Sequence, residues 1–88
     1  MIVLVEPDCV ACVRVLHTAR VLRDQGIVTN LVVLNRIDDP DKCRKFGIVI
    51  FPAVFINGCL AFYGEFSMEH AMRYLEHSQK SQESVALP

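Results

Sequence analysis

Two short apolar runs separated by a single amphipathic segment constrain the fold of this chain most strongly. Residues 2–5 form a continuous apolar run that Glu6 and Pro7 end, and this length and β-branching favour a buried strand. Residues 30–35 enclose an apolar centre between two asparagines, as in a strand of a parallel sheet covered on both faces. Between them, apolar side chains recur at helical spacing up to Gly26, and their shared face comprises Cys12, Val15, Leu16, Ala19 and Leu22. The sequence therefore predicts a parallel strand pair joined by a crossover helix.

The second half of the chain predicts a short helix, a hairpin and a final helix. Asp39 and Pro40 are typical of the N-cap and first position of a helix that ends at Gly47. Asn57-Gly58 between two apolar runs is a strong hairpin signal. Ser67 precedes a segment in which Met68, Ala71, Met72 and Leu75 follow the full helical template. The expected fold is α/β in the order β-α-β-α-β-β-α, with a four-stranded mixed sheet and flanking helices.

Length and composition indicate one small domain. The chain has 88 residues, of which 52% are apolar and 22% charged, a balance typical of a folded protein. We expect the domain to span residues 1–77. Residues 78–88 are polar and lack a helical period, and we expect them to form a disordered tail. A formal net charge of −1 argues against nucleic acid or an anionic membrane as the main partner.

The first apolar run is too short for a secretory signal, which needs about 7–15 apolar residues. No run approaches the ~18 apolar residues of a membrane span. The sequence thus predicts a cytoplasmic protein, and we expect a monomer. In a reducing compartment, a close cysteine pair is more often redox-active or metal-binding than structural.

Cys9 and Cys12 form such a pair at the predicted start of the first helix. Unpaired N–H groups and the positive end of the helix dipole favour a thiolate at this position. Cys9 would be the exposed nucleophile, and Cys12, one turn inside the helix, would resolve a mixed disulfide formed at Cys9. The pair therefore predicts thiol–disulfide exchange as the chemistry and these two residues as its catalytic groups.

Pro52 stands at the head of the first hairpin strand, where proline costs a ladder hydrogen bond. A cis Phe51–Pro52 bond that caps the strand explains its presence and brings backbone close to the cysteine pair. We expect Phe51, Pro52 and Ala53 to shape a substrate-docking loop. Tyr63 and Gly64 return the chain to the same end and are further candidates for substrate binding.

These features resemble the thioredoxin and glutaredoxin superfamily, and the length is similar to that of the small glutaredoxin-like thioredoxins. The resemblance rests on Cys9-Val10-Ala11-Cys12 after the first strand, on Pro52, and on Asn57-Gly58 and Gly64 around the hairpin, and it spans roughly residues 2–77. It implies a central four-stranded sheet, a cis proline facing the active-site disulfide, and electron transfer to protein or small-molecule disulfides without a bound cofactor. The implied partners are disulfide-containing proteins and an electron donor, either a thioredoxin reductase-like enzyme or glutathione.

The chain also departs from that family. No proline lies between the two cysteines, and the sequence has no tryptophan. Val3 lies near the place where thioredoxins carry a buried acid. Glu6 and Asp8 precede the pair, where glutaredoxins tend to carry a basic residue for glutathione. Asp8 is expected to oppose thiolate formation at Cys9.

Soft-metal binding is the alternative function for the same pair. Two thiolates suit Cu(I), and small copper- or zinc-handling domains also place such a pair between a first strand and a first helix. Their order, β-α-β-β-α-β, ends on a strand, whereas this chain ends on an amphipathic segment. A closed structural zinc site needs four ligands, and the chain has no second close pair. No metal ligands are therefore assigned.

The remaining candidate groups are expected to be structural. Cys43 lies on the apolar face of the short helix and is expected to be a buried thiol. Cys59 opens the second hairpin strand, far from Pro52, and is expected to take no part in the exchange. His17, His70 and His77 fall on polar helix faces and are expected to be exposed. The side chains expected to pack in the core or the hairpin are Phe51, Phe55, Phe62 and Phe66.

Overall fold

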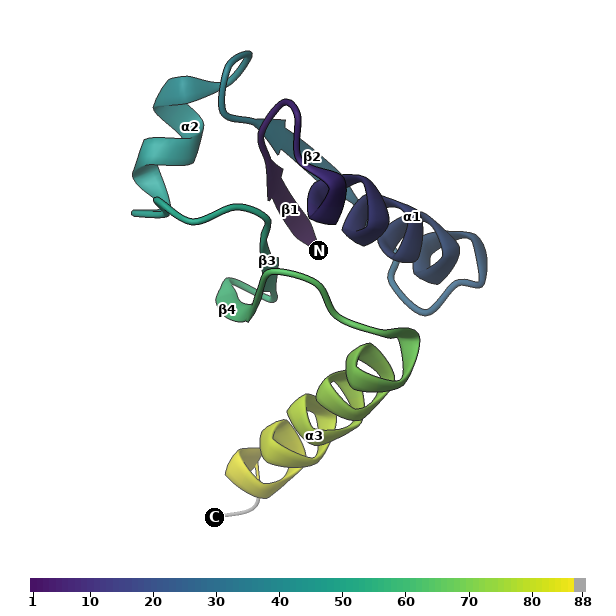
Figure 1. The fold of residues 1–88 in the computed structure, drawn as a ribbon. Helices are drawn as coiled ribbons and strands as arrows, with labels where there is room; N and C mark the ends of the chain where they lie inside the picture. Colours follow the sequence, from purple (N-terminus) through teal and green to yellow (C-terminus); the bar gives the residue numbers. More distant parts are fainter. Residues whose placement is uncertain (87–88) are drawn as a thin grey trace.

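Over residues 1–86 the protein is a small α/β domain with a four-stranded mixed sheet and three helices (Figure 1). The computed structural model describes the backbone of residues 1–86 and the side chains of residues 1–77. In chain order the elements are β1 (Ile2–Val5), α1 (Val10–Asp24), β2 (Val32–Asn35), α2 (Pro40–Lys45), β3 (Ala53–Ile56), β4 (Cys59–Tyr63) and α3 (Met68–Ala86). This is the order of elements expected from the sequence.

The strand order in the sheet is β2-β1-β3-β4. Strand β1 pairs with β2 in parallel, as the crossover through α1 requires, and with β3 in antiparallel orientation. Strands β3 and β4 form the hairpin, in which Ala53 opposes Tyr63 and Ile56 opposes Cys59. The carboxyl ends of β1, β2 and β4 and the amino end of β3 consequently share one end of the sheet.

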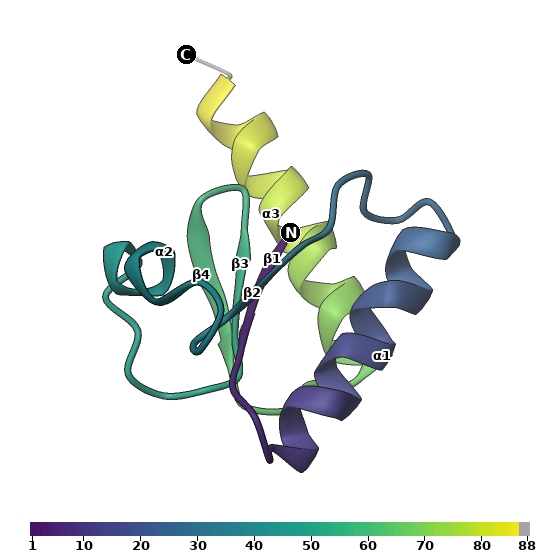
Figure 2. The ribbon, with the colours of Figure 1, turned by 90° about the horizontal axis from the view of Figure 1, so that it is seen from above.

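Helices cover both faces of the sheet. Figure 2 shows α1 and α3 on one face and α2 on the other. The alternation of side chains along β1 divides the core accordingly, since Val3 and Val5 pack with α1 and α3 whereas Leu4 packs with α2. Leu4 and Leu22 are fully buried, one on each face. The two clusters hold the strands and helices that bring the cysteine pair to the end of the sheet.

Strand β2 differs from the expectation. The side chains of Val32 and Val33 are 46% and 39% exposed, and only Leu34 is buried among the apolar residues of this strand. The prediction of a strand covered on both faces is therefore wrong here. The cause is the strand's place at the edge of the sheet, where β1 lies on one side only.

The expected helix end at Gly26, the hairpin turn at Asn57-Gly58 and the helix cap at Ser67 are confirmed. Helix α1 ends before Gly26, which has φ of +74°, and the hairpin turns through Asn57 and Gly58 at φ of +52° and +80°. Both conformations favour glycine or asparagine. At the start of α3 the Ser67 hydroxyl accepts a hydrogen bond from the His70 N–H at 3.1 Å. The turn chemistry in the sequence thus places the hairpin and the last helix.

Helix α3 continues to Ala86, past residue 77, where the sequence analysis placed the start of a disordered tail. Residues 78–86 contain no glycine or proline and include several residues of good helix propensity. Helix propensity is therefore compatible with a helical backbone through residues 78–86, although their sequence lacks an apolar period. The domain boundary at residue 77 stays a prediction. None of the helices in the described residues combines the length and apolar content of a membrane span.

Candidate active site

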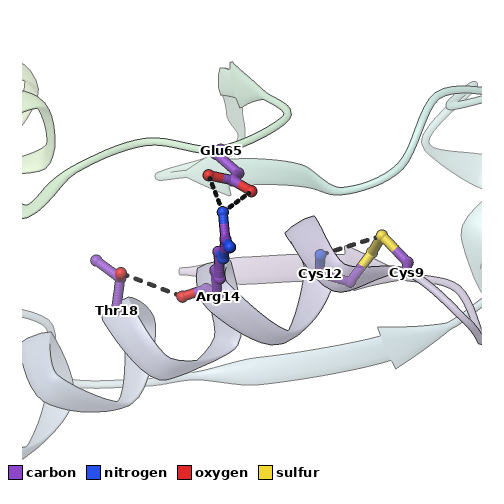
Figure 3. A network of polar contacts seen from close by, with 5 residues as sticks. All are labelled: Cys9, Cys12, Arg14, Thr18 and Glu65. Carbon is purple, nitrogen blue, oxygen red and sulfur yellow. Dashed lines mark hydrogen bonds and ion pairs between the residues drawn. A yellow bond between two sulfur atoms is a disulfide. The ribbon is translucent and has the colours of Figure 1, made fainter.

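A disulfide joins Cys9 and Cys12 at the start of α1, with the two Cα atoms 5.2 Å apart (Figure 3). Cys9 is the N-cap of α1, with extended backbone, and its Sγ accepts a hydrogen bond from the Cys12 N–H at 3.0 Å. The Cys9 carbonyl accepts from the Val13 N–H at 3.2 Å, as the first helical bond. One sulfur thus receives a backbone N–H at the positive end of the helix, where negative charge is stabilised.

The two sulfur-bearing residues differ in exposure. Cys12 is only 2% exposed and belongs to the core cluster that contains Val3 and Val15. Cys9 is half-buried and packs against the margin of that cluster. A large molecule in solution can therefore reach Cys9 far more easily than Cys12. This agrees with the expected roles of nucleophile and resolving thiol, which stay predictions.

The loop before β3 lies at the same end of the sheet as the start of α1, which carries the disulfide (Figure 2). Ala53 opposes Leu4 near the carboxyl end of β1, and Leu4 lies five residues before Cys9. The Phe51–Pro52 peptide bond is cis, Pro52 and Ala53 are buried, and Phe51 packs against both core clusters. The three residues expected to shape a docking loop therefore lie together beside the cysteine pair.

Tyr63 and Gly64 border the same loop. The Gly64 N–H donates to the Pro52 carbonyl at 2.8 Å, and Tyr63 opposes Ala53 at the end of β4. The Tyr63 side chain is 52% exposed. All five residues proposed for substrate binding thus occupy one end of the β3–β4 hairpin. The Pro52 carbonyl already has a partner, so the backbone open to an extended peptide does not include it.

Two ion pairs at this end were not foreseen in the sequence. Arg14 in α1 contacts Glu65 after β4, with Nη1 3.2 Å from Oε1 and 3.5 Å from Oε2 (Figure 3). Arg36 after β2 lies 3.7 Å from Glu6 after β1. The Arg14 pair spans 51 residues of sequence, and no local pattern signals a contact of that range. Both arginines are thereby matched with a carboxylate close to the cysteine pair.

Exposed apolar side chains also gather at this end and escaped the sequence analysis. Val10 and Val13 in α1 are both 67% exposed, while Val49 and Ile50 in the loop before Phe51 are 87% and 59% exposed. Ile37, which follows β2, is 60% exposed. We call these five residues and Tyr63 the apolar rim. Val10 and Val13 lie on the side of α1 opposite its buried face, and the tertiary arrangement brings them to the same end of the sheet as the exposed loop residues.

The other two cysteines are free thiols apart from this site. Cys43 is buried against the opposite face of the sheet, as expected for a core thiol. Burial raises the pKa of the Cys43 thiol, and the Asp39 carboxylate adds to the rise. Cys59 is exposed at the turn end of the hairpin, away from Pro52. His17, His70 and His77 are exposed, as predicted.

The phenylalanines pack as expected. Phe62 stacks on Phe66 with ring centroids 4.5 Å apart and meets Tyr74 at 5.4 Å. Phe55 packs on Phe46 at 4.8 Å. Among the described residues, no three His, Cys, Asp or Glu side chains gather in a group that could hold a metal ion.

Comparison of the chain with models of known protein families gives no match, and comparison with curated protein sequences gives none either.

Proposed function

We propose that this protein is a thiol–disulfide oxidoreductase that exchanges electrons between the Cys9–Cys12 pair and disulfides of proteins or small molecules. The observation that carries the proposal is the asymmetric disulfide at the start of α1, with a half-buried N-cap cysteine and a buried partner one turn later. A structural crosslink between residues so close in one helix constrains little of the chain. A role in reversible thiol–disulfide exchange explains the presence of such a bond better than a structural role does.

In the reducing direction the Cys9 thiolate attacks one sulfur of a substrate disulfide R–S–S–R′. A Cys9–S–S–R bond forms and R′–S⁻ leaves, to be protonated. Cys12 then loses its proton and attacks Cys9 Sγ, which releases R–S⁻. The sum is a protein dithiol plus R–S–S–R′ giving the protein disulfide plus RSH and R′SH. The Cys12 N–H that now bonds Cys9 Sγ also supports a thiolate there.

The fold supports a finer proposal, a thioredoxin-like topology. A parallel pair through α1 is followed by an antiparallel hairpin, and the cis Phe51–Pro52 bond lies at the end of the sheet that carries the cysteines. Phe51, Pro52, Ala53, Tyr63 and Gly64 form the proposed docking site. The proposed partners are disulfide-containing proteins and a reductase or thiol donor in the cytoplasm, acting on a monomer without a cofactor.

The test compares Cys9→Ser, Cys12→Ser and the control Cys59→Ser in reduction of a protein disulfide with dithiothreitol as the electron donor. We expect Cys9→Ser to abolish turnover. Cys12→Ser, reduced and then freed of dithiothreitol before the substrate is added, should accumulate a mixed disulfide at Cys9 that mass spectrometry detects. Cys59→Ser should retain full activity, because Cys59 lies at the far end of the hairpin. Full activity in Cys9→Ser would overturn the proposal.

The soft-metal alternative uses the same two thiolates, and its test is independent. Titration of the reduced protein with Cu(I) in competition with a chelator would show a tight complex that depends on both Cys9 and Cys12. Tight binding without disulfide-reductase activity would favour metal transfer over redox exchange.

A further inference from the structure

Asp8 combines an unusual backbone conformation with a charge next to the proposed nucleophile. Its φ is +56°, the left-handed region that few residues other than glycine, asparagine and aspartate adopt readily. Pro7 and Asp8 form the turn between β1 and the N-cap Cys9. The conformation alone would explain aspartate, but it would equally explain asparagine or glycine, which carry no charge. The backbone conformation therefore does not explain why this position carries a negative charge.

The surrounding charges leave the Asp8 carboxylate uncompensated. Arg14 is paired with Glu65, and Arg36 lies beside Glu6, so each of these arginines is matched by a carboxylate. Within residues 1–77, whose side chains the structure describes, Asp8 has no ion-pair or hydrogen-bond partner. Its side chain is exposed directly before Cys9. The ionisable groups on the neighbouring segments at this end of the sheet are Glu6, Arg14, Arg36, Asp38, Asp39, Tyr63, Glu65 and His70.

We propose that the Asp8 carboxylate disfavours the Cys9 thiolate and so biases the pair toward the disulfide, which makes the reduced protein a stronger electron donor. This inference rests on the proposed function. It assigns Asp8 as a positioning and tuning residue that acts through Cys9. The helix N-terminus favours the thiolate, and the negative charge one residue earlier opposes it.

The sign follows from the balanced reaction with a reference dithiol. Protein disulfide plus reduced dithiothreitol gives protein dithiol plus oxidised dithiothreitol. Ionisation of Cys9 stabilises only the right-hand side, because the disulfide has no thiol to ionise. A charge that opposes ionisation therefore shifts the equilibrium to the left. Coulomb's law for two exposed unit charges on neighbouring residues in water gives roughly a threefold effect.

The experiment uses Asp8→Asn as the main variant, since asparagine tolerates the left-handed conformation but lacks the charge. Asp8→Gly is a second variant with the same two properties. Asp24→Asn, at the far end of α1, is the matched control with an equal change in net charge. Each protein is equilibrated in dithiothreitol or glutathione buffers between about pH 6 and about pH 9, and its thiolate is followed separately by ultraviolet absorbance of the reduced protein after the buffer thiols are removed.

For both Asp8 variants we expect the equilibrium to favour the dithiol by about threefold more than in the parent, which is about 14 mV for a two-electron couple. The difference should grow with pH until Cys9 is ionised in both proteins and should shrink in about 1 M salt, where the screening length is about 3 Å. The thiolate should also form at a lower pH. Asp24→Asn should match the parent.

A reversible titration in which Asp8→Asn and the parent coincide at every pH would refute the role of the charge and leave Asp8 as a turn residue. A shift shared by Asp24→Asn would refute it too, because net charge alone would then be responsible. Absence of any reversible Cys9–Cys12 couple in the parent would instead refute the proposed function itself. The two failures are therefore distinguishable.

Discussion

Reduction of the Cys9–Cys12 bond should leave this protein folded and only moderately less stable. The bond closes a loop of sequence separation 3 inside the first turn of α1. The chain-entropy relation gives such a short loop about 1.9 kcal/mol at 25 °C, near the lower end of disulfide effects. Most buried side chains of the two core clusters come from strands and helices away from the bond, so we expect the folded dithiol to keep both clusters. The free energy of unfolding should therefore fall by about 2 kcal/mol or less.

The assay is urea unfolding followed by circular dichroism, with the oxidised protein and the protein held in a phosphine reductant. For a domain of this size, about 2 kcal/mol corresponds to a fall in melting temperature of roughly 8–16 °C. The Cys9→Ser/Cys12→Ser double variant is the control, and its unfolding should be the same in both conditions. Cys43 and Cys59 are free thiols and should add nothing.

A loss of more than about 4 kcal/mol on reduction, or a dithiol form unfolded without urea, would contradict this reasoning. It would mean that the bond holds the fold together, as in small secreted domains. A protein of that kind could not cycle between its dithiol and disulfide forms without unfolding.

Three further predictions concern the core, the buried thiol and the hairpin turn. Leu4→Ala should lower the free energy of unfolding by about 3–5 kcal/mol, because Leu4 is fully buried. Urea unfolding measures this loss, and a loss under about 1 kcal/mol would show that Leu4 is not tightly packed. Burial and Asp39 raise the pKa of the Cys43 thiol above its ordinary 9.0, so the folded state keeps the proton that the unfolded chain releases. The parent should consequently lose stability relative to Cys43→Val as pH rises from about 8 to about 10, and equal slopes would be contrary to the assignment. Gly58→Ala should cost roughly 1 kcal/mol, because Gly58 has φ of +80°, and a neutral effect would argue against the turn conformation.

Local chemistry made most of the fold predictable. Asn57-Gly58, Ser67 and the stop at Gly26 each act through their own backbone or their nearest neighbours, and the structure places each as expected. The parallel pairing of β1 and β2 followed from the length of the connection, which admits a crossover helix but no tight turn.

The position of a strand within the sheet could not be predicted in the same way. An apolar centre in residues 30–35 is compatible with a central strand or an edge strand, and only the packing of the whole sheet makes β2 an edge. The prediction of a tail from residue 78 relied on the loss of an apolar period, whereas helix propensity is compatible with the extent of α3 to Ala86.

The site was predictable in its chemistry and less so in its surroundings. Two cysteines at the start of a helix and a proline before a strand are visible in the sequence, and the sheet brings them to one end. The Arg14–Glu65 pair and the apolar rim depend on segments far apart in the chain. Those contacts are decided by tertiary packing, which a single sequence does not display.

The central claim is that Cys9 and Cys12 form a reversible redox couple, and a redox-buffer titration tests it most directly. The purified protein is equilibrated across a series of buffers, quenched by alkylation and digested, and the bridged and alkylated peptides are weighed. We predict a single reversible two-electron transition confined to a Cys9–Cys12 bridge, with Cys43 and Cys59 as thiols throughout. A pair that stays in one state across the whole series, or a bridge that forms through Cys59 instead, would contradict the account.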